Sequence, residues 1–413
     1  MPFFTRIQFT LAAAIAMHGS QVFAAAPVRP LVANVASIPS PCGPGAMGSS
    51  LVTSAEGEHW LSWLEPVEAG QHALKCARFD AARSRWGESR LIARGAGWFV
   101  NWADFPALAV QKDRLTAAWF VGSHGGGGHH GDGYHAEFSV STDGGATWSA
   151  PQPLTRASDS VEFVAFQPLP DGRLLAAWLD GRARRGGKNQ QALYSRVLGG
   201  EIGADVLVDD FVCDCCQLSF VPTADGGALL AYRGRTKDEV RDMRTARFRA
   251  GRWEPSQLLH ADGWKIAGCP VNGPQLASSR EHVTAAWFTV ANNQPRVYLA
   301  RAKDRTAEFG LPTQIDLGRP AGRVDCAVLS DGAAVVTWLE NSGTEKEGGI
   351  FLRVQSPRGE LSAPMLLAPT TTARASGFPR ITLLHDASPA QFLLCYTQEG
   401  TPSKVVTALV TVR

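Results

Sequence analysis

One short pattern recurs along the chain: small or aliphatic residues lead into an aromatic residue, and polar turn residues follow. The aromatic position is filled seven times, by Trp63, Trp119, Trp178, Tyr232, Trp287, Trp338 and Tyr396. Successive copies lie 51 to 59 residues apart. The apolar runs are short and are bounded by Gly, Pro, Asp and Asn, and helical periodicity is nowhere sustained. The pattern therefore predicts repeated groups of short strands.

Each repeat predicts four strands, A to D. The aromatic pattern marks strand B, and runs such as PALAV, VAFQP, PQLAS and PRITL precede it as strand A. Repeats of four strands at this length are typical of a β-propeller. We predict an all-β propeller with seven blades, or six if one repeat is irregular. The last repeat lacks one strand, which residues 29–38 would supply, closing the ring and removing two sheet edges.

Composition supports a large globular core. Of the 413 residues, 45% are hydrophobic and 19% are charged, which excludes disorder. The 42 Gly and 25 Pro fit a fold with many turns. A net charge of +2 does not favour nucleic-acid binding. The length alone suggests two or three domains, but the repeat indicates one propeller domain over residues 27–413, which we expect to be a monomer.

Residues 1–26 read as a secretory signal peptide. Arg6 supplies a basic start, residues 11–17 are apolar, and Ala24, Ala25 and Ala26 offer small residues for cleavage. The apolar stretch is too short to span a bilayer, and no later apolar segment is long enough to span one. We therefore expect a protein exported to a bacterial periplasm or secreted. There the eight cysteines could form up to four disulfides.

Residues 141–148 (STDGGATW) match the S-x-D-x-G-x-x-W Asp-box. The phrases VCDCCQ at 212–217 and DGWKIAGCPVNGPQLA at 262–277 extend the likeness over much of the chain. The chain resembles the sialidase-like (BNR, Asp-box) propeller superfamily, in particular exported bacterial proteins labelled exo-α-sialidase. The resemblance implies an Asp-box on a C–D turn. If the protein is an enzyme, it implies a glycoside hydrolase with a Tyr nucleophile, carboxylate helpers and an arginine fork for the sugar carboxylate.

In a propeller the D–A and B–C connections share one face, where ligands usually bind. Asp104 and Glu162 are the acid candidates on this face, and Tyr134 and Tyr194 are candidate nucleophiles. The candidates for the arginine fork are Arg182, Arg235, Arg323, Arg374 and Arg380. Three tryptophans at D–A connections either stack on a sugar or cap the channel: Trp98, Trp102 and Trp264.

The cysteines predict a second kind of site on the same face, one that depends on sulfur. Cys213, Cys215 and Cys216 form a C-x-C-C cluster, and Cys269 is expected beside them at the next blade. One interpretation is a disulfide between Cys269 and one of the three. Another is a thiolate site for copper(I) or zinc, and a third is a redox-active or vicinal disulfide.

A Gly-rich loop at residues 123–135 carries four histidines, which either bind metal with the cysteines or are solvated: His124, His129, His130 and His135.

Three functions follow from these patterns. The first is a carbohydrate-processing enzyme, or a relative with altered chemistry, that binds a small molecule or glycan at the Cys/Arg/Asp mouth of the channel. The second is a periplasmic metal-binding protein that uses the cysteine cluster and the histidine loop. The third is a scaffold whose face binds a partner protein.

Overall fold

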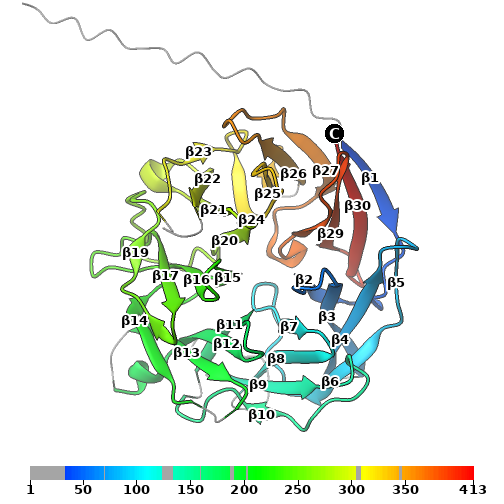
Figure 1. Ribbon diagram of the computed structural model, residues 1–413, viewed down its shortest axis with the longest axis vertical. Helices are drawn as coiled ribbons and strands as arrows, with labels where there is room; N and C mark the ends of the chain where they lie inside the picture. Colours follow the sequence, from blue (N-terminus) through cyan, green and yellow to red (C-terminus); the bar gives the residue numbers. More distant parts are fainter. Residues whose placement is uncertain are drawn as a thin grey trace, which may run out of the picture.

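The computed structural model describes residues 33–68, 70–122, 134–158, 160–186, 190–200, 203–303, 308–343 and 347–413. The predicted signal peptide and His124, His129 and His130 lie outside these residues. Within them the chain forms seven antiparallel sheets arranged in a ring around a central axis (Figure 1). The seven-bladed prediction is confirmed, and the six-bladed alternative is wrong.

The first three blades occupy the amino-terminal half of the chain. Blade 1 consists of β2 (Met47–Thr53), β3 (His59–Glu68), β4 (Gln71–Asp80), β5 (Arg85–Trp86) and β6 (Arg90–Ala96). Blade 2 consists of β7 (Ala107–Gln111), β8 (Arg114–Gly122), β9 (Tyr134–Ser141) and β10 (Gln152–Pro153). Blade 3 consists of β11 (Val161–Pro168), β12 (Leu174–Asp180), β13 (Gln191–Leu198) and β14 (Val206–Val212).

The other four blades repeat this plan. Blade 4 consists of β15 (Ser219–Pro222), β16 (Ala228–Arg233), β17 (Met243–Arg249), β18 (Arg252–Trp253) and β19 (Gln257–Leu258). Blade 5 consists of β20 (Gln275–Ser278), β21 (His282–Thr289), β22 (Arg296–Lys303) and β23 (Thr313–Gln314). Blade 6 consists of β24 (Pro320–Val328), β25 (Ala334–Asn341), β26 (Gly348–Gln355) and β27 (Met365–Thr370). Blade 7 consists of β28 (Arg380–His385), β29 (Ala390–Gln398), β30 (Lys404–Val412) and β1 (Ala33–Ile38).

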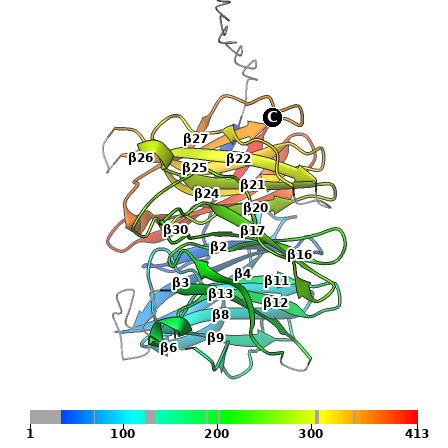
Figure 2. The ribbon, with the colours of Figure 1, turned by 90° about the vertical axis from the view of Figure 1, so that its left-hand side faces the viewer.

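In the part of the chain that the structure describes, three short 3-10 helices lie in the connections: η1 (Arg182–Gly186), η2 (Ala291–Asn293) and η3 (Arg374–Ser376). Seen from the side, blades 2 and 3 lie at one end of the ring, and β21, β22 and β24 to β26 lie at the other (Figure 2). No helix of the described residues is long and apolar enough to cross a membrane.

An amino-terminal strand closes the ring, as the spare-strand pattern predicts. β1 pairs antiparallel with β30, with Ile38 opposite Thr407 and Ala33 opposite Val412 (Figure 1). Ile38 is buried and packs into a cluster that joins blade 7 to blade 1. The two ends of the described chain therefore complete one sheet, which leaves no gap between blades 7 and 1.

The repeated aromatic residues form the core between blades. Each lies in the second strand of its blade, and the five tryptophans at this position are almost fully buried: Trp63, Trp119, Trp178, Trp287 and Trp338. Trp119 packs with Leu74 and Ile92 of the preceding blade. Burying side chains of this size against the neighbouring blade stabilises the ring as a whole.

In three blades, a carboxylate two residues after the tryptophan accepts a hydrogen bond from the buried indole N–H. Trp63 donates to Glu65 over 2.8 Å, and Trp178 donates to Asp180 over 2.8 Å. In blade 6 Trp338 donates to Glu340 over 2.5 Å. Side chains two apart on a strand point to the same face, so the spacing itself brings donor and acceptor together. These acids are structural partners of the core rather than ligands of the channel.

The Asp-box residues form the turn between β9 and β10, the third and fourth strands of blade 2, as predicted. Asp143 accepts hydrogen bonds from the backbone of Ala146 at 3.0 Å and of Thr147 at 2.9 Å. Hydrogen bonds from the Thr147 side chain and backbone hold the pKa of Asp143 well below its usual range. The turn lies on the C–D side, away from the D–A and B–C loops described next.

Candidate functional site

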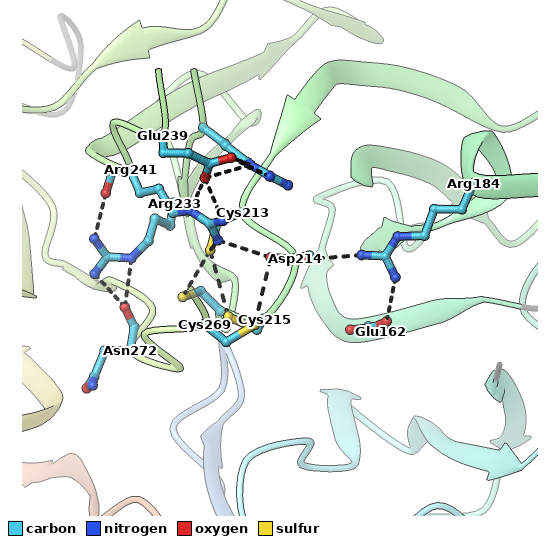
Figure 3. A network of polar contacts seen from close by, with 12 residues as sticks. Glu162, Arg184, Cys213, Asp214, Cys215, Arg233, Glu239, Arg241, Cys269 and Asn272 are labelled. Atoms are coloured by element: carbon cyan, nitrogen blue, oxygen red, sulfur yellow. Dashed lines mark hydrogen bonds and ion pairs between the residues drawn. The ribbon is translucent and has the colours of Figure 1, made fainter. Parts of the chain in front are cut away.

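The inner strands of all seven blades line a central channel of about 540 Å³. At one mouth of this channel the D–A and B–C loops meet. Side chains from blades 3 to 5 join there into one polar network (Figure 3), and Tyr134 of blade 2 adjoins it. The face predicted to hold the ligand site is therefore the face on which charged and sulfur groups converge.

The first part of the network is a buried trio of Asp104, Tyr134 and Glu162. The Tyr134 hydroxyl donates to Asp104 Oδ1 over 3.0 Å, and it also hydrogen-bonds with Glu162. All three residues are at most 3% exposed. Asn101 orients Asp104, because its side-chain oxygen accepts hydrogen bonds from the backbone of residues 103 and 104. The structure thus brings both predicted acids onto one of the two candidate tyrosines.

Glu162 reaches this position through an irregularity in the innermost strand of blade 3. The pairing of β11 with β12 shifts between Glu162 and Ala165, and Phe163 has a φ of 52°. A non-glycine residue in this region costs about 1–2 kcal/mol, and bulges of this kind re-aim side chains beside functional sites. The bulge turns Glu162 toward Tyr134.

Burial dominates the electrostatics of the trio. Desolvation, reinforced by the negative charge of Asp104, raises the pKa of Glu162 well above its usual value, although Arg184 opposes the shift. Desolvation and the two carboxylates likewise raise the pKa of Tyr134. Glu162 can therefore carry a proton at a pH where an exposed glutamate is ionised.

Arg184 links the trio to the cysteine loop. It lies in η1, and its guanidinium is 3.2 Å from Asp214 and 4.0 Å from Glu162. Asp214 in turn accepts a hydrogen bond from Arg241 over 3.1 Å (Figure 3). Arg184 was not among the residues predicted from the sequence. The run of three arginines at positions 182, 184 and 185 of a B–C loop is the signal that points to it.

The second part of the network is a set of three buried thiols. Cys213 Sγ lies 3.9 Å from Cys215 Sγ and 3.7 Å from Cys216 Sγ, and each residue is at most 1% exposed. The three sulfurs all lie within 4.8 Å of one another. These three residues follow β14, which ends at Val212. The loop that follows gathers all three sulfurs.

Two arginines place positive charge beside Cys213. Arg241 Nη1 donates to Cys213 Sγ over 3.3 Å. Arg233 is 1% exposed, and its guanidinium donates to the backbone carbonyls of residues 241, 272 and 288. Burial opposes ionisation of Cys213, but thiol hydrogen bonds from Cys215 and Cys216 and these two charges outweigh it. The pKa of Cys213 therefore lies well below its usual value.

Cys269 reaches the cluster from the next blade, as predicted. It is exposed, its sulfur lies 4.0 Å from Asp214 Oδ1, and it groups with Asp214 and Cys215 within 4.8 Å. All eight cysteines are free thiols, so none of the predicted disulfides is present. The closest Cys213 contact, 3.7 Å, far exceeds a disulfide bond of about 2 Å. The loop gathers the sulfurs without bonding them.

The five predicted arginines separate into two groups. Arg182 pairs with Asp180 at 2.7 Å and Asp205 at 2.8 Å and stacks on Tyr194. Arg235 pairs with Glu239 at 2.6 Å. These two side chains are engaged by acids of their own blades and do not join the other three.

Arg323, Arg374 and Arg380 gather around a stacked pair, Trp102 and Phe378, whose ring centroids are 5.7 Å apart. Arg323 is committed to the Ser376 hydroxyl and to backbone carbonyls of residues 372, 373 and 377. Arg374 is exposed. Arg380 lies 4.9 Å from the Phe105 ring centroid, and its buried Nε has no hydrogen-bond partner. Arg374 and Arg380 are therefore the arginines of this group with donors to offer a ligand.

The remaining candidates have separate positions. His135 Nε2 lies 3.8 Å from Glu137, and the metal-compatible clusters among the described residues contain cysteine and Asp214 but no histidine. Trp98 packs on Trp119, and Trp264 lies under Arg233 at 4.7 Å. Trp102 shares a loop with Asp104, so it is the one tryptophan of the three placed between the buried trio and the arginines.

No protein-family model and no curated protein matches the chain. The chain does match solved structures. A protein of unknown function from Dyadobacter fermentans aligns at 12% identity over 94% of this chain and 100% of its own, with a TM-score of 0.54. A PL25 ulvan lyase bound to -[GlcA(1-4)Rha3S]- aligns at 12% identity, over 92% of this chain and 96% of its own, with a TM-score of 0.55. An α-L-arabinanase from Penicillium chrysogenum aligns at 13% identity, over 92% and 98%, with a TM-score of 0.47. At these identities the likeness shows the propeller fold.

Proposed function

We propose that this protein cleaves glycosidic bonds of an acidic sugar at the mouth of the channel that holds Asp104, Tyr134 and Glu162. The observation that carries the proposal is the Tyr134 hydroxyl held between two buried carboxylates. Propellers of this architecture include carbohydrate-active enzymes such as the ulvan lyase above. The sialidase-like resemblance of the sequence supports the same class of reaction.

The chemistry follows from the protonation states of the trio. Glu162, protonated because of its raised pKa, donates its proton to the glycosidic oxygen as that bond breaks. Tyr134 attacks the anomeric carbon, and Asp104, 3.0 Å away, receives the phenolic proton. Ionised Glu162 then takes a proton from the water that attacks the anomeric carbon. The bond between that carbon and the Tyr134 oxygen breaks, and Asp104 returns its proton to that oxygen, so all three side chains regain their starting protonation states. This follows the tyrosine-nucleophile exception to the usual pair of carboxylates.

Positive charge at the mouth favours an anionic substrate. Arg374 is exposed beside Trp102, and Arg380 has an unpartnered Nε within the channel. A guanidinium binds a carboxylate with two parallel hydrogen bonds, and the Trp102 ring offers a surface for a sugar face. Arg323 supports this group rather than binding substrate, since its donors are already used.

The test is turnover of a panel of fluorogenic glycosides that includes a sialoside, a glucuronide and an arabinoside. We expect release from a carboxylate-bearing glycoside. The Tyr134→Phe and Glu162→Gln variants should lower kcat by about 10²–10⁴-fold. Tyr194→Phe is the matched control, because that ring stacks on Arg182 away from the trio. Arg380→Lys should raise KM for the acidic glycoside more than it lowers kcat.

Absence of turnover across the panel by folded protein would overturn the proposal. Cleavage of a polyuronate that yields an unsaturated sugar, with no released aglycone, would also overturn it and indicate elimination instead.

A further inference from the structure

A second site lies beside the trio, and the proposed glycan chemistry does not use it. We propose that Cys213, Cys215 and Cys216 bind one copper(I) ion through their three buried sulfurs, with Cys269 as an outer thiol for metal exchange. The inference rests on the sulfur geometry, the charges around it and the exposure of Cys269. It is independent of the proposed function.

The sulfur spacing suits a bound soft metal ion. Two sulfurs on a tetrahedral zinc ion, with Zn–S bonds of about 2.3 Å, lie about 3.8 Å apart. The Cys213–Cys215 and Cys213–Cys216 separations of 3.9 and 3.7 Å match this scale. Thiols brought this close without forming a disulfide are already arranged as ligands, so little ordering entropy remains to be lost on binding.

The number of preformed ligands favours copper(I) over zinc. Structural zinc sites almost always have four ligands, whereas within the described part of the chain only three sulfurs lie within 4.8 Å of one another. Cys269 groups with Cys215 but not with Cys213 or Cys216, so it completes no tetrahedron in this arrangement. Thiolate is a soft ligand and selects soft metals such as copper(I).

The surroundings compensate the charge of such a complex. Three thiolates and one copper(I) ion carry a net charge of −2. Arg241 donates a hydrogen bond directly to Cys213 Sγ, and Arg233 is buried near the same cysteine. Among the described residues Arg233 has backbone carbonyls rather than a carboxylate as its hydrogen-bond acceptors. A buried cation of this kind stabilises a buried anionic cluster.

Cys269 connects the buried sulfurs to solvent. It is exposed, and its sulfur approaches both Cys215 and Asp214. An ion arriving from a donor could bind first to Cys269 and Cys215 and then pass to the buried set as the thiols lose their protons. The same path would serve release to an acceptor.

The experiment is a titration of the reduced full-length protein with copper(I) under anaerobic conditions, against a chromophoric copper(I) chelator. We expect one ion per chain, and X-ray absorption should show a sulfur-only shell of three ligands. Cys213→Ser and Cys216→Ser should weaken binding by more than about 100-fold. Cys42→Ser, which changes a cysteine of blade 1, should leave binding unchanged. Cys269→Ser should keep the affinity within about tenfold but slow transfer to the chelator.

The X-ray absorption spectrum of the copper-loaded wild-type protein identifies the copper ligands directly. The test therefore remains decisive even if a serine variant fails to fold. A nitrogen- or oxygen-containing copper shell would overturn the proposal. It would also fail if zinc binds through four sulfurs in preference to copper(I), or if the reduced protein binds neither metal.

Discussion

Arg241 donates a hydrogen bond to the sulfur of Cys213 over 3.3 Å, although the two residues lie 28 positions apart in different loops. The same guanidinium also binds Asp214 and Glu239, so its position is held from two sides. One arginine thus joins the carboxylates of the channel mouth to its thiols, and the charge of each group depends on the others.

The first prediction concerns this contact. Replacing Arg241 with Gln removes a positive charge beside Cys213, so the pKa of that thiol should rise. The ultraviolet absorbance of the thiolate, followed against pH in metal-free reduced protein, measures the shift. Arg235→Gln is the control, because Arg235 binds the same Glu239 but not the sulfur. An equal shift in both variants would contradict a specific contact.

The second prediction concerns pH and stability. Glu162 has a folded pKa above its unfolded value of about 4.3, so the folded state holds a proton that the unfolded state has lost. The contribution of protonated Glu162 to the free energy of unfolding is fully present below the unfolded pKa. It disappears as pH rises through the folded pKa. Glu162→Gln cannot titrate, so its free energy of unfolding should fall less steeply over that window. Chemical denaturation at several pH values tests this; parallel curves for both proteins would refute it.

The third prediction concerns the carboxylates that follow the core tryptophans. Asp180 accepts from the Trp178 indole and pairs with Arg182 in a fully buried position. Asp180→Asn should lower the free energy of unfolding by about 2 kcal/mol, because the buried Trp178 indole and the half-buried Arg182 guanidinium both lose a charged acceptor. Urea unfolding measures it. Asp171→Asn breaks an exposed pair with Arg173 and should leave the unfolding midpoint where it is.

The fourth prediction concerns ring closure. Ile38 in β1 packs between blades 7 and 1, so Ile38→Ala should cost about 2–5 kcal/mol and lower the melting temperature. Ser37→Ala, at an exposed position of the same strand, should stay within about 0.5 kcal/mol of the wild type. Equal stability of the two variants would show that this strand does not close the ring.

The fold was predictable because its signal is local. Trp63, Trp119 and their counterparts recur at blade spacing, and each faces the neighbouring blade through the alternation of a strand. The spare strand at residues 33–38 followed from counting strands in the last repeat. Strand order and the face on which charged and sulfur side chains converge could be predicted without knowledge of long-range contacts.

The site was only partly predictable. Asp104, Glu162 and the four cysteines are where the face argument expects them, but Arg182 and Arg235 are held by acids of their own blades. No local pattern shows that Tyr134 lies between two carboxylates, since this depends on a bulge at Glu162 and an asparagine turn before Asp104. Arg184 was missed because its partners come from other strands and loops.

The sequence by itself determined a propeller, with seven blades favoured over six, together with its closing strand and the cysteines at its mouth. It could do so because the alternation of buried residues along a strand and the turn residues between strands are patterns of a few positions. Only the tertiary structure decided which side chains touch. Cys213 and Cys269 are 56 residues apart, and their loops approach each other because adjacent blades pack side by side. The free thiols, the arginine at Cys213 and the raised pKa of Glu162 all follow from that packing. It removes water and sets each charge against its neighbours.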